Sequence, residues 1–205
     1  MMMRLATFAL AGAFLATAQP AAAQSTQAVQ LSQQDRAVVS QVEDYLDGIS
    51  TLQARFNQVN PDGGVSRGDF YLERPGHMRL EYDREPYVYM ADGVWLTFYD
   101  AELDSRSDVP LGDTIADFIV REDVSFDGDV TLTGLRYNDS QVEVDLVQSD
   151  DPTAGIITLV LSRGPLQLES WTVVDAQNQV TRVVLSELEF DIDLPFSLFQ
   201  PPTNW

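Results

Sequence analysis

Hydrophobic and polar positions alternate with a period of two along most of this chain, which is typical of β-strands that bury one face. The clearest case lies within 68–82. Phe70 and Leu72 alternate with polar neighbours before Pro75-Gly76, and apolar residues alternate again after it. Because Pro-Gly is a turn signal, the stretch predicts two antiparallel strands joined by a tight turn.

The same pattern recurs on both sides of this pair. It predicts strands over 52–57, 87–90, 94–99, 101–107 (an edge strand), 130–138, 142–146, 156–161, 166–174 and 180–190. Asp92-Gly93 adds a two-residue hairpin signal between two of them. About 11 strands are enough to curl a sheet most of the way round a barrel. Since neither a linker nor a shift in composition divides them, we predict one mainly β domain with a meandering antiparallel sheet.

Two segments follow a helical period instead. The first begins at Ser32, a helix N-cap with an acid three residues later, and ends near Gly48. Its apolar stripe consists of Val38, Val39, Val42, Leu46 and Ile49. The second, over 114–120, places Ile115, Phe118 and Ile119 on one side. Its position between hairpins fits either a lid over the sheet or a helix that fills one barrel end as ordinary core.

The N-terminal 23 residues have the features of a secretory signal peptide. Arg4 precedes an apolar run over 5–18, and Ala21-Ala22-Ala23 supplies a small-residue cleavage site. This site argues against the alternative of an uncleaved membrane anchor. We therefore predict a signal peptide over 1–23 and a mature domain over 24–205.

The chain contains no cysteine. A secreted protein without cysteine depends on its core rather than on disulfides, and it has no thiol at the cleavage site to carry a lipid of its own. We therefore expect a free protein in the periplasm of a Gram-negative bacterium.

Charge narrows the partners further. The chain has 12 arginines, no lysine and 32 acidic residues, for a net charge of −20. Such a charge repels nucleic acid and anionic lipid headgroups. It indicates a solvated acidic surface, with a basic partner surface as the weaker alternative. The absence of lysine also excludes Schiff-base chemistry.

Catalytic signals are sparse. His77 is the only histidine and no G-x-S-x-G motif is present, so a histidine-dependent hydrolase would have to use this residue. Two groups of acidic residues occur in the second half of the chain: Asp145, Asp150 and Asp151 form one, and Asp191 and Asp193 form the other. Neither group has the residue spacing of a calcium-binding loop. We expect no enzyme, no cofactor and no metal site.

Aromatic residues gather on three neighbouring predicted strands. They are Tyr82, Tyr87, Tyr89, Trp95, Phe98 and Tyr99. The strand over 94–99 is apolar on both faces, more than a one-sided sheet requires. Either the sheet is covered on both sides, or a concave face lined by apolar groups forms a binding cavity under movable helices.

Several short motifs occur in one order along the chain. They are G-x-F-x-L-x-R-P-G-x-x-R-x-x-Y over 68–82, Phe56-Asn57-Gln58, Asp92-Gly93 with Trp95 and Tyr99-Asp100, and Phe199-Gln200-Pro201-Pro202. Together they resemble the periplasmic carriers of outer-membrane lipoproteins, the LolA type of the Lol pathway, over nearly the whole predicted mature chain. The resemblance implies an incomplete (open) antiparallel β-barrel whose N-terminal and mid-chain helices form a lid over a hydrophobic cavity.

The resemblance also implies roles for individual residues. Arg74 matches the arginine that holds the lid shut through hydrogen bonds to backbone carbonyls of the lid helices. A guanidinium carries five donors and keeps its charge, so in an apolar mouth it needs such partners; the alternative is a surface arginine beside a turn. The expected acyl-cavity residues are Leu52, Phe56, Phe70, Leu72, Met78, Leu80, Tyr82, Met90, Leu96, Phe98, Ile115, Phe118 and Ile119.

The function implied is that of a monomeric periplasmic carrier. It would receive acylated lipoproteins from an inner-membrane lipoprotein-releasing ABC transporter and deliver them to an outer-membrane acceptor lipoprotein or to the outer membrane directly. Some relatives carry a C-terminal extension beyond the position of Trp205, so the resemblance does not carry over to this chain the functions of that segment, including control of transfer direction. The alternatives are a related lipid-binding or envelope-sensing module carrying phospholipid or glycolipid, and a periplasmic hydrolase.

Overall fold

The structure is a computed structural model that describes residues 27–200, apart from the side chain of Ile115. The predicted signal peptide over 1–23, the predicted start of the mature chain at Gln24 and the last part of the C-terminal motif, Pro201-Pro202, lie outside the described residues. No helix within the described range is long and apolar enough to cross a membrane.

Eleven strands form a single antiparallel sheet, which confirms the predicted fold class. They are β1 (Thr51–Val59), β2 (Val65–Glu73), β3 (His77–Tyr82), β4 (Tyr87–Asp92), β5 (Trp95–Asp100), β6 (Ser105–Pro110), β7 (Val130–Tyr137), β8 (Gln141–Gln148), β9 (Gly155–Arg163), β10 (Leu166–Asp175) and β11 (Val180–Phe190). The helices are α1 (Gln33–Asp47) and α2 (Ile115–Val120), with short 3-10 helices η1 (Leu111–Asp113) and η2 (Phe196–Phe199).

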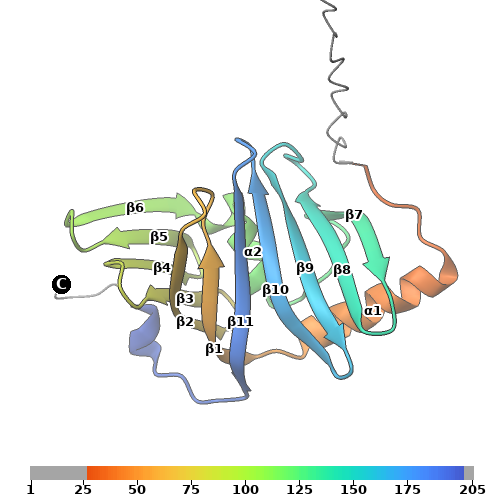
Figure 1. The fold of residues 1–205 in the computed structure, drawn as a ribbon, viewed down its shortest axis with the longest axis horizontal. Coiled ribbons are helices and arrows are strands. Elements are labelled where there is room, and N and C mark those ends of the chain that lie inside the picture. Colours follow the sequence, from red (N-terminus) through yellow and green to blue (C-terminus); the bar gives the residue numbers. More distant parts are fainter. Residues whose placement is uncertain (1–26, 201–205) are drawn as a thin grey trace, which may run out of the picture.

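The sheet has the order β6-β5-β4-β3-β2-β1-β11-β10-β9-β8-β7. Pairing of β1 with β11 joins the two halves of the chain, while β6 and β7 remain the two edges, so the barrel is open. Strands β7 to β11 are steep in Figure 1, whereas β4 to β6 run almost across them, so the sheet is strongly curved.

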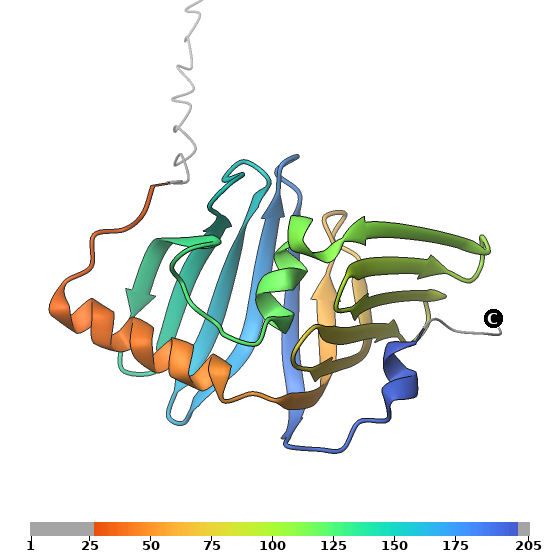
Figure 2. The same cartoon turned by 180° about the vertical axis from the view of Figure 1, so that it is seen from behind.

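Helix α1 starts where the sequence predicts. The Ser32 hydroxyl accepts a hydrogen bond from the Asp35 amide (3.1 Å), and the Asp35 carboxylate accepts one from the Ser32 amide (2.9 Å). This capping box satisfies amides that the first helical turn leaves unpaired. The buried stripe of α1 then packs on the sheet. Both α1 and α2 lie on the concave side of the sheet (Figure 2), which we call the inner face.

The apolar side chains of the alternating strands face these helices. Facing pairs such as Leu52 with Leu72 and Phe70 with Leu80 put side chains from neighbouring strands on the inner face. These side chains belong to one hydrophobic core that also includes α1, α2 and the strands β7 to β10. The helices are therefore part of the core rather than appendages to it.

The predicted edge strand over 101–107 is misplaced. Strand β6 covers Ser105–Pro110, and the preceding residues form a turn in which Asp104 has a positive φ of 47°. Every residue of β6 is exposed, so no hydrophobic alternation marks it. Its strand conformation comes from hydrogen bonding to β5.

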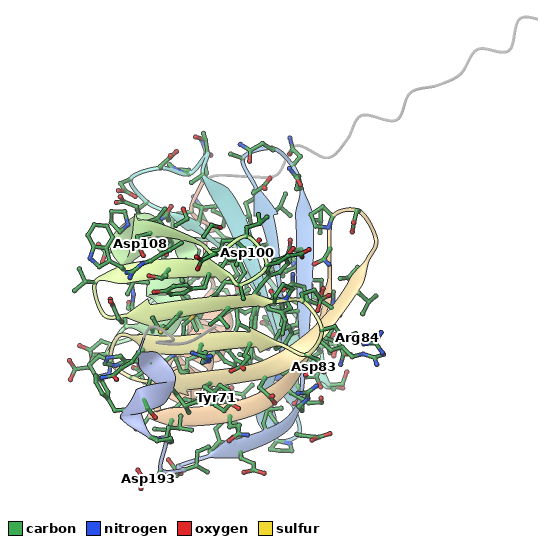
Figure 3. The ribbon with its side chains drawn as sticks, turned by 90° about the vertical axis from the view of Figure 1, so that its left-hand side faces the viewer. Tyr71, Asp83, Arg84, Asp100, Asp108 and Asp193 are labelled. Carbon is green, nitrogen blue, oxygen red and sulfur yellow. The ribbon has the colours of Figure 1, made fainter. Side chains whose placement is uncertain are left out.

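The C-terminal helix η2 covers part of the opposite, outer face. The Arg79 guanidinium donates to the Leu198 carbonyl (3.1 Å), and the rings of His77 and Phe199 lie 5.4 Å apart. In Figure 3, which faces strands β2 to β6, η2 lies over one end of these strands with Tyr71 beside it. The sheet is thus covered on both sides around β3 and β4.

Candidate functional site: an arginine clamp under two helices

Arg74 follows the last residue of β2 and begins the turn to β3. Its own amide donates to the Ser50 carbonyl (2.8 Å), and the Gly76 amide donates to the Val120 carbonyl at the end of α2 (2.7 Å). Gly76 has a φ of 90°, a conformation that glycine adopts without strain. The turn is therefore fixed by its backbone against both the start of β1 and the end of α2.

The guanidinium of Arg74 connects the ends of the two inner-face helices. Nε donates to the Ile119 carbonyl in α2 (2.9 Å), and Nη1 donates to the Leu46 carbonyl in α1 and, more weakly, to the Ile49 carbonyl (3.5 Å). Carbonyls in the last turn of a helix lack helical partners and carry partial negative charge. One cation thus caps the C-terminal ends of both helices, an arrangement that we call the arginine clamp.

The clamp stays charged at neutral pH. Burial lowers the pKa of Arg74 to about 10, and the nearby Asp47 carboxylate acts in the opposite direction. The carbonyl partners do not titrate. The clamp therefore keeps both its charge and its acceptors across the physiological pH range.

A small apolar cavity lies directly beside the clamp. Its lining combines both helices with strands from both halves of the sheet: Leu46, Ile49, Leu52, Phe70, Leu72, Arg74, Phe118, Ile119, Leu159, Leu168 and Trp171. Its volume is about 20 Å³, room for one water molecule at most. Small-molecule sites usually measure roughly 300–1,000 Å³. The helices therefore pack directly on the cavity lining, and a ligand larger than a water molecule would have to displace them.

A second set of bonds holds the segment after α2 to α1. The Asp47 carboxylate accepts from the Val124 amide (2.5 Å), and the Glu43 carboxylate accepts from the Phe126 amide (2.7 Å). The rings of Phe118 and Phe126 are 5.8 Å apart. Helix α1, helix α2 and residues 121–126 thus form one connected cover, which we call the lid.

The structure divides the expected cavity residues into groups. Leu52, Phe70, Leu72, Phe118 and Ile119 line the cavity together with Arg74. Further along the inner face, and outside this cavity, lie Phe56, Met78, Leu80, Tyr82, Leu96 and Phe98. The side chain of Ile115 lies outside the described part of the structure.

Met90 is on the wrong face for a cavity residue. It pairs with Arg79 on β3 and with Thr97 on β5, whereas Leu80 pairs with Tyr89. Residues directly opposite in an antiparallel pair share a face, so Met90 points to the outer face. There it is fully buried near η2, which contacts β3 and β4.

Sequence reasoning missed half of the cavity wall. Leu46 and Ile49 belong to the predicted stripe of the first helix but were not assigned to the site. Leu159, Leu168 and Trp171 come from β9 and β10. Trp171 packs against Phe70 with ring centroids 5.5 Å apart, a contact between opposite walls of the barrel. The alternation of apolar residues over 156–174 indicates that these strands have a buried face. Only the curvature of the whole sheet shows that this face lines the cavity.

The structure also places the residues that were considered for catalysis or metal binding and not favoured. The ring of His77 packs against Phe196 and Phe199 on the outer face, away from the cavity. Asp145 is bonded to Arg136 and Thr158. Within residues 27–200, no group of three His, Cys, Asp or Glu side chains is placed to hold a metal ion.

The fold and the site define a class of protein: an open antiparallel barrel in which an arginine clamps a helical lid over an apolar cavity. Residues 47–202 match the family of the outer membrane lipoprotein carrier protein LolA, and the chain belongs to this family. The resemblance found in its short motifs is thereby confirmed.

Individual proteins are similar to this chain over most of its length. An outer-membrane lipoprotein carrier protein from Methylococcus capsulatus is 28% identical over 186 residues, covering 84% of this chain and 88% of the relative. A crystal structure of an uncharacterized conserved protein from Thermus thermophilus shares the fold with a TM-score of 0.50 and 12% identity, covering 84% of this chain and 96% of the other. A LolA superfamily protein from Nitrosomonas europaea is similar with a TM-score of 0.46 and 12% identity, covering 80% and 97% of the two chains.

Proposed function

We propose that this protein is a periplasmic carrier that holds the acyl chains of lipoproteins released from the inner membrane and delivers them to the outer membrane. Membership of the LolA family and the name of the relative from Methylococcus capsulatus support a lipoprotein carrier rather than an enzyme. The observation that carries the proposal is the arginine clamp over an apolar cavity that is closed when empty. The working form would be the mature domain over 24–205.

The clamp and the cargo compete in this mechanism. In the closed form, Arg74 is bonded to both helices and the apolar lining packs against itself. An entering acyl chain displaces the lid, breaks the bonds of Arg74 and gains about 0.8 kcal/mol for each methylene that leaves water. Because the broken bonds offset part of this gain, the chain is held tightly enough for transit and weakly enough for release.

Loading and unloading require partners on both membranes. We assign loading to the lipoprotein-releasing ABC transporter of the inner membrane, because extracting several acyl chains from a bilayer needs an energy source. Unloading would run to an acceptor lipoprotein or to the outer membrane directly, where more of each chain can be buried.

Native mass spectrometry of the mature protein tests the proposal. The protein is purified from periplasm with and without a co-expressed triacylated lipoprotein. A one-to-one complex with the acylated polypeptide is the expected result. Bound phospholipid or glycolipid alone would replace lipoprotein with free lipid as the cargo, and an empty protein under both conditions would contradict a carrier function.

A further inference from the structure

A second cavity lies at the other end of β1. Its volume is about 490 Å³, and its walls carry the rings of Tyr82, Tyr87 and Tyr89 and the polar side chains of Gln58, Asn60 and Thr181. It opens between the β1–β2 turn and the β10–β11 turn, which lie close together at the top of the barrel in Figure 1. Leu52 of the lid cavity is six residues from Gln58, so the two cavities are about 20 Å apart along the strand.

The aromatic wall of this cavity is continuous. The ring of Tyr82 lies 6.4 Å from that of Tyr87 and 6.3 Å from that of Tyr89, and the ring of Tyr89 lies 4.8 Å from that of Phe98 at a tilt of 39°. Each ring packs against its neighbours, so the three tyrosines are held in place along this wall. Burial raises the pKa of Tyr82 and of Tyr89. Their hydroxyls therefore remain protonated donors at neutral pH.

A chain of hydrogen bonds fixes the polar wall. The Tyr82 hydroxyl donates to Gln58 Oε1 (2.8 Å), and Gln58 Nε2 donates to Asn60 Oδ1 (2.6 Å). Asn60 Nδ2 then donates to Ser66 Oγ (3.1 Å), which in turn donates to Glu85 Oε1 (2.7 Å). This half-buried network holds its members in one arrangement.

Other polar groups at the cavity are left unused. Among residues 27–200, the hydroxyls of Tyr87, Tyr89 and Thr181 and the side-chain amide of Gln179 make no hydrogen bond to another residue, and none of them is a buried unpaired group. They stand beside the aromatic wall and supply both donors and acceptors. A ligand that fills the cavity thus meets flat apolar rings together with unpaired polar groups.

We propose that this cavity binds a neutral saccharide. Sugar rings present C–H faces that pack on aromatic rings, and their hydroxyls bond to amides and hydroxyls at the edges, so one ligand satisfies both walls. Among the described residues that line the cavity, Asp62 alone is charged, and the chain carries a net charge of −20, so an anionic ligand is repelled. A quaternary ammonium would use the rings but leave the polar groups unpaired. The site is separate from the lid cavity, and the proposal does not rest on lipoprotein transport.

Binding to the full mature chain tests this site. Maltose and N,N′-diacetylchitobiose are titrated by calorimetry and by NMR, with glucose 6-phosphate and choline chloride as charged comparisons. We expect saturable binding of a neutral saccharide and a loss of at least about tenfold in affinity for Tyr89→Ala. Tyr71→Ala on the outer face (Figure 3) is the matched control and should bind as wild type does.

Specific results would overturn the proposal. Absence of saturable binding up to about 10 mM of either saccharide would do so, as would tighter binding of choline or glucose 6-phosphate. If Tyr89→Ala fails to fold, Thr181→Val takes its place, because it removes only a hydroxyl from the wall. Unchanged affinity in the folded variant would place the saccharide elsewhere. Arg74→Leu should leave saccharide binding intact, so failure of the carrier proposal and failure of this one can be told apart.

Discussion

Replacing Arg74 with leucine removes every side-chain bond of the clamp while keeping an apolar side chain beside the cavity. The Ile119 carbonyl then loses its partner, whereas the Leu46 carbonyl keeps the bond from the Ile49 amide (3.2 Å). The substitution destabilises the closed, empty form, in which these bonds exist. It does not destabilise the form in which cargo has already displaced the lid and broken them. We therefore expect Arg74→Leu to hold cargo longer than wild type.

The size of this effect follows from the bonds lost. Hydrogen bonds to charged groups contribute about 1.5–3 kcal/mol each. Because Arg74 is only half-buried, we take the lower value for its two stronger bonds, which gives about 3 kcal/mol. That equals the burial of about four methylenes and corresponds to a change of roughly 100-fold in an equilibrium constant.

Release of a fluorescent triacylated lipopeptide to lipid vesicles measures this directly. Arg74→Leu should release its cargo on the order of 100-fold more slowly. Arg74→Lys should fall between the two, because a single ammonium keeps the charge but lacks the planar fork that reaches both helices. Arg67→Leu, which makes the same charge change on the outer face of β2, the strand that Arg74 follows, should match wild type.

A release rate for Arg74→Leu within about threefold of wild type would refute the reasoning, because it would limit the contribution of the clamp to under about 0.7 kcal/mol. Faster release would refute it as well. In that case the arginine would help to retain cargo rather than to expel it.

Three further predictions concern the lid and the barrel. Hydrogen bonds to the Asp35 carboxylate lower its pKa below the ordinary 3.8. The contribution of this carboxylate to the free energy of unfolding is therefore present above pH 3.8 and is lost as the pH falls through the folded-state pKa. Asp35→Asn should flatten the loss of stability to urea between about pH 5 and pH 2. Gly68→Ala should destabilise the barrel by about 1–3 kcal/mol, because a Cβ there would clash with a carbonyl of β3 and lie 2.7 Å from an aromatic ring. Glu43→Gln should raise hydrogen exchange of the Phe126 amide about tenfold, because it replaces a charged acceptor.

Each of these predictions has its own control. Parallel pH profiles for Asp35→Asn and wild type would contradict the first. Gly112→Ala meets no atom within 4 Å and should leave the urea midpoint unchanged, so equal loss in both glycine variants would contradict the second. The third requires that amides of β8, which the lid carboxylates do not contact, exchange as in wild type.

Most strands could be predicted because they have one buried face. In β1 and β2 the buried side chains alternate strictly with more exposed ones, and this alternation is visible in the sequence. Strand β6 has no buried residue, so its position depends on backbone pairing that leaves no side-chain pattern. The error at 101–107 has this cause.

It was harder to infer which face of the sheet each side chain lies on and which distant strands the curved sheet brings together. In β4, Val88 and Met90 are buried on the outer face and Ala91 on the inner face, so the local pattern does not reveal which side meets the lid. The cover over Met90 comes from η2, more than 100 residues later in the chain. Likewise, Trp171 reaches the lid cavity only because β11 pairs with β1. Such contacts depend on how the whole sheet curves.

Every lid-side partner of the clamp is a main-chain carbonyl. Any amino acid supplies such an acceptor, so the clamp places no demand on the side chains at 46, 49 and 119 provided that both helices end where they do. The clamp therefore lets one apolar side chain replace another on the inner surface of the lid, where Leu46 and Ile49 are buried, while a single arginine keeps the ability to close it. Among related carriers, the length of the two helices should then be under tighter selection than their sequence.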